Sequence, residues 1–216
     1  MTRIYYDTEF LDTGKSIDLV SIGLVAGERE YYAVNGGMDP VAVNDNTFLR
    51  DHVVPHLPQR KESWMPHRWL DIWHPDVKSQ QQIAAEVYAF ITSFSDPELW
   101  ADWSAFDHVG LSWLAGRPMV ELPPGVPDRT NDLQQEAARL GNPPLPEQMT
   151  GRHHALADAR RNQRVGEYLA ELAKKRVTIN GRVYEVLEWD SRDGNGDEET
   201  WVLHARRLPA DQQGHA

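Results

Sequence analysis

The 216-residue sequence contains no cysteine, and this absence excludes disulfide frameworks, thiolate metal sites and cysteine nucleophiles. It also lacks an apolar run of the roughly 18 residues that a membrane-spanning helix needs. The first residues, MTRIYYDTEF, do not form a basic and then apolar leader. Neither a glycine-rich phosphate loop ending in Lys-Ser or Lys-Thr nor a Gly-x-Ser-x-Gly elbow occurs. We therefore expect a cytoplasmic protein that does not bind membranes.

Positive charge is scarce, because 22 Lys and Arg residues face 33 Asp and Glu residues, and the net charge is −11. A protein this acidic is not held to nucleic acid by a general basic field. Clustered carboxylates can, however, bind divalent cations, which then supply local positive charge. The charge balance therefore disfavours a passive nucleic-acid binder more than it disfavours a metal-dependent nuclease.

The hydrophobic pattern predicts an α/β protein with a mixed β-sheet flanked by helices. The first three strands follow one another closely, as in an antiparallel meander. The expected strands cover residues 3–10, 17–26, 28–35 and 98–103, and the expected helices cover residues 79–94, 105–116, 129–141 and 153–175. Ser79 is the expected N-cap of the first of these helices. The proline-rich stretch 36–78 allows only short helices, one of them stopping before Pro55.

After residue 175 the sequence alternates around the turn-rich SRDGNGDE, which predicts a C-terminal β-hairpin extension. The expected division is thus a catalytic domain over residues 1–175 and an extension over residues 176–216.

Asp7 and Glu9 form the first candidate site, because residues two apart in a strand point to the same face. Two such carboxylates repel each other unless a cation neutralises them. Asp-x-Glu recurs at 96/98 and 197/199, but there the surroundings are typical of solvated loops. Only the first pair lies inside an apolar strand; the alternative is an edge strand with a solvated face.

Asp107 and the pair His153/Asp158 are the second and third candidates. Taken alone, Asp107 is a routine N-cap of an apolar helix, and Asp102 competes with it for a functional role. His153 and Asp158 lie five residues apart, so they do not share a helical face. They converge only if His153 lies on the preceding loop, which Gly151 makes plausible. The alternative is a surface helix with a solvated aspartate.

Together these residues supply four carboxylates and one histidine. Four oxygen-rich acids suit two hard cations such as Mg²⁺ or Mn²⁺. Two such ions roughly 4 Å apart can clamp the attacking and leaving oxygens of an in-line phosphoryl displacement. A neutral histidine beside them can remove a proton from the attacking water. This set of groups is suited to hydrolysing a phosphodiester.

The order D-x-E, F-D and H-x-x-x-x-D resembles the DEDDh 3′–5′ exonucleases, which have a ribonuclease-H-like fold. The segments YYDTEF, IDLVSIGLVA, REYYAV, ELWADWSAFDHVGL and HHALADAR are similar to the mycobacterial polyadenylate-specific 3′-exoribonucleases, over about residues 1–175. The resemblance implies that four residues bind two Mg²⁺ ions, for which Mn²⁺ can substitute, and that His153 is the general base. The implied metal ligands are Asp7, Glu9, Asp107 and Asp158.

The same resemblance implies a homodimer that acts on single-stranded, adenylate-containing RNA 3′ ends. Thr8, Phe10 and Trp103, which are neighbours of the motifs in the sequence, are assigned to substrate binding. Many DEDDh enzymes carry an asparagine shortly before the second aspartate, but this chain has ADWSAF there. Two rival functions stay open: a DEDDh exonuclease acting on DNA or short oligonucleotides, and a catalytically silent nucleic-acid-binding module.

Two further groups of residues have open roles. Trp64, Trp69 and Trp73 can stack on bases, or they can pack in the core or at an oligomer contact, which we favour. The histidines of the proline-rich stretch show no pair on a convincing helical face, so a zinc site is not expected; they are His52, His56, His67 and His74.

Overall fold

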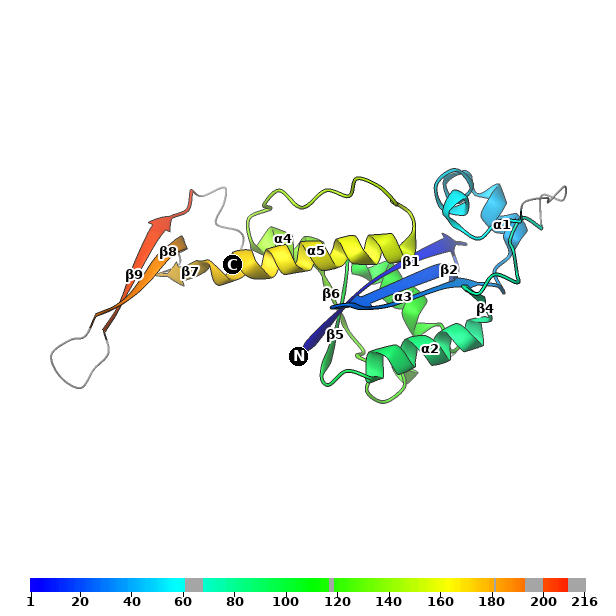
Figure 1. Cartoon of the computed structure of the whole chain (residues 1–216), viewed down its shortest axis with the longest axis horizontal. Helices are drawn as coiled ribbons and strands as arrows, with labels where there is room; N and C mark the ends of the chain where they lie inside the picture. Colours follow the sequence, from blue (N-terminus) through cyan, green and yellow to red (C-terminus); the bar gives the residue numbers. More distant parts are fainter. Residues whose placement is uncertain (61–67, 117–118, 181, 193–199, 210–216) are drawn as a thin grey trace. The chain divides into compact units, whose positions relative to one another are not determined.

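The computed structural model describes residues 1–60, 68–116, 119–180, 182–192 and 200–209, and the chain forms two compact units (Figure 1). Unit 1 comprises Met1–Leu133 and Glu147–Arg164, and unit 2 comprises Gln134–Pro146 and Val165–Ala216. Among the described residues, no helix is both long and apolar enough to cross a membrane.

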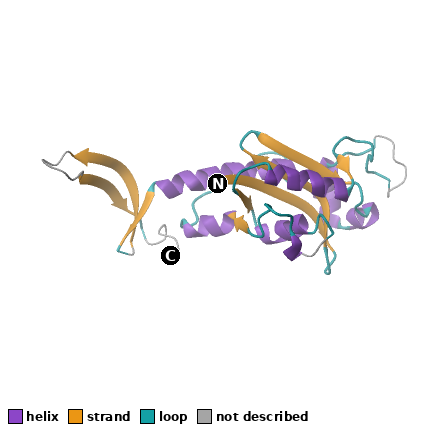
Figure 2. Cartoon of the chain, turned by 90° about the horizontal axis from the view of Figure 1, so that it is seen from below, coloured by secondary structure: helices purple, strands orange, loops and turns teal. Residues whose placement is uncertain are grey.

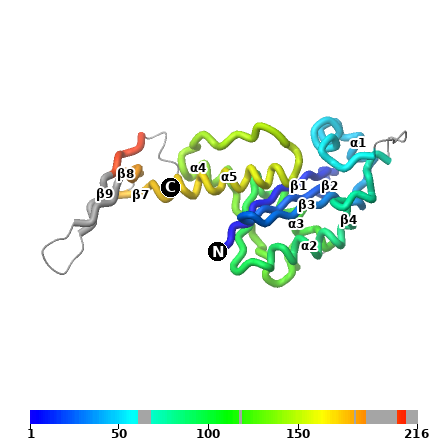
Figure 3. The backbone as a smooth tube through the Cα atoms, viewed as in Figure 1, coloured from blue at the N-terminus to red at the C-terminus, as the bar shows by residue number. Residues whose placement is uncertain are grey.

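The predicted N-terminal meander is confirmed (Figure 3). Strands β1 (Thr2–Asp12), β2 (Ile17–Ala26) and β3 (Arg29–Asn35) pair antiparallel in that order. β2 is buried along nearly its whole length, which explains why its apolar run is almost continuous. Gly27 makes the tight turn to β3 with φ +62°, a conformation that favours glycine.

Three more strands complete a six-stranded sheet of order β4-β3-β2-β1-β5-β6, which confirms the predicted mixed sheet. β5 (Pro97–Ala101) lies parallel to β1 and was expected from the sequence. β4 (Val77–Lys78) and β6 (Thr130–Asp132) were not, because they are two and three residues long. The helix predicted over 129–141 is correspondingly shorter: α4 covers Leu133–Arg139.

Helices α2 (Gln80–Thr92) and α3 (Ser104–Ser112) pack on one face of this sheet. As predicted, Ser79 caps α2, and its hydroxyl accepts the Gln82 N–H at 3.2 Å. The core on this face combines apolar side chains of β1, β2, β5 and both helices, including Ile4, Tyr6, Ile22, Ile83, Leu99 and Leu111. α3 ends at Ser112, four residues before the predicted end at Gly116.

A second core forms where the proline-rich stretch folds back on the sheet. It contains α1 (Pro40–Asp45) and the helical turns Leu49–Val53 and Val54–His56. The first turn ends at Val53, which confirms the expected stop before Pro55, and this proline lies at the start of the second turn, where proline fits. A further short turn lies at Met119–Glu121.

The preferred packing role is confirmed for one of the three clustered tryptophans. Trp69 is 7% exposed within the second core, and its indole N–H donates to the Pro40 carbonyl at 3.0 Å. Trp73 is 84% exposed, and Trp64 lies outside the described residues.

The long helix α5 (Ala155–Lys174) begins in unit 1 directly against β2 (Figure 1). A Cβ atom added to Gly23 would lie 2.5 Å from the Ala155 carbonyl group and from Cα of Leu156. Ala155 and Ala159 are fully buried, so small residues on both elements allow this close approach. The start of α5 is therefore fixed at backbone-to-backbone distance from the sheet.

In unit 2, strands β7 (Arg176–Ile179), β8 (Arg182–Arg192) and β9 (Thr200–Arg207) form an antiparallel sheet of that order (Figure 2). The predicted C-terminal hairpin corresponds to β8 and β9, and β7 adds a third strand before it.

Replacing Gly23 by alanine tests the close approach of α5. We expect Gly23→Ala to lower the free energy of unfolding by about 1–3 kcal/mol, as overpacking of a tight contact does. The matched control is Gly110→Ala in α3. There the nearest heavy atom to the new Cβ is the Thr8 hydroxyl oxygen, at 3.7 Å. That helical substitution should be neutral or stabilising by up to about 1 kcal/mol. Urea denaturation of both variants measures the difference, and equal stabilities would contradict the contact.

Candidate active site

The site lies where β1 and β5 part. These strands pair only from Thr2↔Pro97 to Tyr5↔Trp100, whereas β1 continues to Asp12. Beyond this pairing, side chains rather than a described strand satisfy two backbone groups of β1. The Thr8 N–H donates to Asp107 Oδ1 at 2.7 Å, and the Tyr6 carbonyl accepts from Asn162 Nδ2 at 3.0 Å. These bonds join α3 and α5 to the open edge of β1.

Asp107 reaches this edge from the first turn of α3. It accepts a second hydrogen bond from the Thr8 hydroxyl at 2.6 Å and is 5% exposed. It is not the N-cap of α3, because the helix begins at Ser104, whose N–H donates to Asp132 at 2.7 Å. The sequence placed the start of this helix one residue too late, and Asp107 is held by β1 instead.

Asp102, the competing acid, forms an ion pair with Arg161 of α5. Its charge still reaches the cluster, because it raises the pKa values of both Asp7 and Asp107.

His153 and Asp158 converge through the loop that the sequence predicted. Gly151 has φ +73° and His153 has φ +64°, so the chain turns sharply before α5. The Asp158 N–H donates to the His154 carbonyl at 3.0 Å, while Asp158 Oδ2 accepts the His153 N–H at 2.8 Å. The first bond is an ordinary bond of the helix, and the second ties the backbone of His153 to the start of α5.

Glu9, His153 and Asp158 each offer a ligand atom, and these atoms lie within 4.8 Å of one another. Asp7, which pairs with Gly23, is half-buried, and its carboxylate feels the charges of Asp107, Glu9 and Asp158. The structure thus brings Glu9, His153 and Asp158 within reach of one ion, and Asp7 and Asp107 lie close enough for their charges to act on the same acids.

Burial and mutual repulsion strongly perturb these acids. Burial first, and then the charges of Asp158 and Asp107, raise the pKa of Glu9 to about 8. Burial also raises the pKa of Asp107 to about 7, although the two Thr8 hydrogen bonds act against it. The pKa of Asp7 is raised well above its usual value by burial and by Asp107, and burial raises the pKa of Asp158.

His153 responds in the opposite direction. Burial lowers its pKa, and the neighbouring His52 and Arg152 act in the same sense, while Asp158 opposes them. The imidazole is therefore neutral at physiological pH. Hard carboxylate oxygens that repel one another fit a divalent cation of the Mg²⁺ or Mn²⁺ type, which would relieve the repulsion.

The three residues assigned to substrate binding lie in different surroundings. Thr8 is 5% exposed, and its hydroxyl supports Asp107. Phe10 stacks on Phe106, with ring centroids 5.9 Å apart, and Phe106 is 52% exposed. Trp103 precedes α3 and is 70% exposed. Their assignment to substrate binding stays a prediction.

Several neighbours of the third motif were missed from the sequence. The rings of Phe48 and His52 contact His153, and Tyr32 stacks on His154 with centroids 4.5 Å apart. The Gln148 side chain lies near Asp158 and counteracts part of the rise of its pKa. The four-residue spacing of His52 and His56 was the available signal, but nothing in that spacing indicates contact with a loop about 100 residues later.

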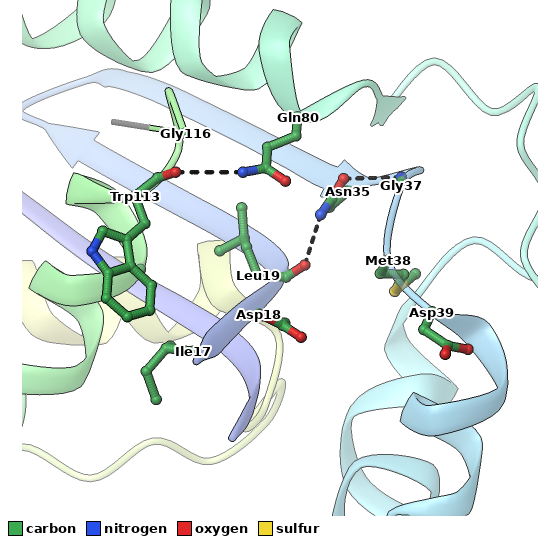
Figure 4. A pocket seen from close by; sticks show the side chains of 11 residues that line it. Ile17, Asp18, Leu19, Asn35, Gly37, Met38, Asp39, Gln80, Trp113 and Gly116 are labelled. Atoms are coloured by element: carbon green, nitrogen blue, oxygen red, sulfur yellow. Dashed lines mark hydrogen bonds between the residues drawn. The ribbon is translucent and has the colours of Figure 1, made fainter. Parts of the chain in front are cut away.

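A separate cavity of about 530 Å³ lies between the ends of β2 and β3 and the helices α2 and α3 (Figure 4). Its amide groups bond to the protein itself: Asn35 bonds to the Leu19 carbonyl and the Gly37 N–H, and Gln80 bonds to the Trp113 carbonyl. None of the five predicted residues lines it. This cavity is therefore distinct from the carboxylate cluster.

Comparison with known proteins identifies relatives of the chain. Residues 2–170 match the family described as the 3′–5′ exoribonuclease Rv2179c-like domain. Two curated relatives, 3′–5′ exoribonuclease Rv2179c of Mycobacterium tuberculosis strain H37Rv and 3′–5′ exoribonuclease MT2234.1 of strain CDC 1551, are each 40% identical over 161 residues. The match covers 73% of this chain and 87% of each relative.

The raised pKa values predict a pH-dependent stability that Mg²⁺ reverses. Between about pH 4, where unfolded carboxyls titrate, and about pH 8, the pKa of Glu9, the clustered acids bind more protons in the folded protein than in the unfolded chain. Stability without metal should therefore fall as the pH rises. Mg²⁺ held by this cluster would bind the ionised acids, so we expect it to raise the melting temperature more at pH 8 than at about pH 5.

Glu9→Gln should weaken both effects, because it removes one of the repelling charges. The exposed Glu121 provides the control, and Glu121→Gln should behave like the wild type. Thermal melts at both pH values, with Mg²⁺ and with EDTA, measure the effect. An Mg²⁺ stabilisation independent of pH, or unchanged in Glu9→Gln, would contradict the metal assignment.

Proposed function

The chain belongs to the family of Rv2179c-like 3′–5′ exoribonuclease domains, and from this premise we propose that it is a metal-dependent exoribonuclease of the DEDDh type. It would remove nucleotides one at a time from RNA 3′ ends. The observation that carries the proposal is the convergence of four carboxylates and a neutral histidine at the open edge of β1.

In this proposal the four acids hold two Mg²⁺ ions, for which Mn²⁺ can substitute. When bound, the ions would neutralise the acids and stabilise negative charge on the scissile phosphate and the leaving oxygen. The chain's own contribution is preorganisation. The hydrogen bonds of Thr8 fix Asp107, and α5 carries Asp158 to within reach of Glu9. The metal-binding residues are Asp7, Glu9, Asp107 and Asp158.

His153 acts as the general base. Its neutral ring accepts a proton from the attacking water through a ring nitrogen, and the lowered pKa keeps that nitrogen free at neutral pH. The water oxygen forms a bond to phosphorus while the bond to the 3′ oxygen of the preceding nucleotide breaks, and that oxygen takes up a proton from solvent. The products are a nucleoside 5′-monophosphate and an RNA shortened by one residue with a 3′-hydroxyl.

Finer traits remain part of the proposal. We propose a catalytic domain over residues 1–175 with an extension over 176–216, a preference for adenylate-containing RNA, a homodimer and a cytoplasmic location. The exposed ring of Trp73 is apolar surface suited to a subunit contact. A silent nucleic-acid-binding module is disfavoured, because a binder gains nothing from clustered acids beside phosphates.

Labelled substrates test the activity. We expect 5′-labelled RNA to shorten stepwise from its 3′ end, and 3′-labelled RNA to release mononucleotide at once, with Mg²⁺ or Mn²⁺ but not with EDTA. Asp7→Asn should lose more activity than the about 10–100-fold that removal of an outer-shell metal partner costs. Asp12→Asn, an exposed position on the same strand, is the control.

Substrate panels separate the rival functions. Poly(A), poly(U), poly(C) and DNA, digested side by side, show whether RNA and adenylate are preferred. Faster cleavage of DNA would favour the rival DEDDh exonuclease, and metal-dependent turnover by Asp7→Asn at the wild-type rate would contradict the proposed mechanism.

Paired histidine variants test the base. His153→Ala should slow cleavage by roughly 10²–10⁴-fold while Mg²⁺ still raises the melting temperature. His154→Ala should cost little rate at temperatures where it is folded, because that ring stacks on Tyr32. In the wild-type pH–rate profile, the midpoint of the acid limb should lie at a pH below the usual histidine pKa of about 6.5. An impaired His154→Ala beside a normal His153→Ala would show that the motif register is wrong.

A further inference from the structure

His153 is held in a backbone conformation that non-glycine residues rarely adopt. Its φ of +64° lies in the left-handed region, which costs of order 1 kcal/mol or more and persists only when the surroundings over-determine it. One restraint is the hydrogen bond from its N–H to Asp158. That bond fixes the backbone of His153 but leaves the torsions of its imidazole free.

Two rings from a distant segment contact the imidazole. The Phe48 ring meets it edge-on with centroids 5.0 Å apart and an interplanar angle of 83°, and the His52 ring lies 5.5 Å away. Phe48 and His52 are four residues apart at a helical turn, and their own rings lie 5.0 Å apart. The three rings therefore contact one another pairwise.

The segment that carries these rings is anchored in the core. Leu49 directly follows Phe48, and Val53 directly follows His52. Their side chains are 3% and 0% exposed and belong to the second core. The Leu49 N–H donates to Asn46 Oδ1 at 3.0 Å. Phe48 itself is 51% exposed and His52 is also exposed, so neither ring is needed to fill the core. A segment anchored in the core thus places the rings of Phe48 and His52 against the loop that carries His153.

We propose that Phe48 and His52 are positioning residues, which hold the imidazole of His153 toward Glu9 and Asp158. This inference rests on the proposed function, in which His153 is the general base. Misplacing a reacting group by about 1 Å can cost on the order of 10²-fold in rate. A ring that is free to rotate away from the acids would remove the proton less often.

The rival role for these rings is direct contact with a nucleobase, since Phe48 is half-exposed. The two roles differ kinetically. A residue that acts through His153 lowers the rate constant at saturating RNA and leaves KM unchanged, whereas a base contact shared by bound substrate and transition state raises KM. The two roles also differ in a His153→Ala background, where a positioning residue has nothing left to position.

The experiment compares Phe48→Ala and His52→Ala with His52→Phe and with His74→Ala, a control for loss of a partly exposed histidine. Phe48→Ala and His52→Ala should each lower kcat about 10–100-fold with KM within about twofold. His52→Phe should keep near-wild-type kcat, because the ring contact rather than the imidazole nitrogens is required. In the His153→Ala background neither alanine should slow cleavage further.

A raised KM at unchanged kcat, or a loss that persists in the His153→Ala background, would overturn the proposal. Trypsin cleavage after the exposed Arg152 gives a readout that does not need RNA hydrolysis. We expect the Arg152–His153 bond to be cut faster in Phe48→Ala and His52→Ala than in the wild type or His74→Ala, as mass spectrometry of the fragments would show. Equal rates would overturn the positioning role, whereas failure of the proposed function would appear as wild-type protein without metal-dependent cleavage. Phe48→Leu replaces Phe48→Ala if the latter does not fold.

Discussion

The open edge of β1 is the constraint on which the site depends. Past its pairing with β5, this strand carries backbone groups that must find partners away from water. Asp107 and Asn162 supply those partners, and they come from the two helices that the site needs. The bonds that complete the sheet therefore also assemble the carboxylates. Another strand paired along this edge of β1 would satisfy the same backbone groups, but it would occupy the position of Asp107.

The cluster opposes the stability of the fold that builds it. Glu9 and Asp107 are buried with raised pKa values, so in the absence of a cation their ionisation is unfavourable in the folded protein. Of the neighbouring charges, that of Asp102 is compensated, because this aspartate pairs with Arg161. The fold thus tolerates a group of buried acids whose ionisation works against its stability.

The strand and turn patterns of the sequence predicted those parts of the site that depend on neighbouring residues. Strand alternation placed Asp7 and Glu9 together, and Gly151 indicated the loop that lets His153 meet Asp158. The sequence did not predict β4 and β6, which are two and three residues long, because they are strands only through pairing with β3 and β5. Contacts between segments that are distant in the sequence were not predicted for the same reason. No spacing in the sequence connects Phe48 with His153, and the open role of Trp69 was decided only by its burial in a core that the proline-rich stretch builds.

Asp158 has two tasks, because one of its oxygens accepts the His153 N–H while the carboxylate also belongs to the cluster. Such sharing creates thermodynamic linkage between loop order and charge at the cluster. Whatever stabilises the ionised form of Asp158 strengthens the bond that orders the loop, and whatever orders the loop favours that ionised form by the same free energy. The charge of the carboxylate cluster and the order of the loop that carries His153 are in this way coupled without any moving domain.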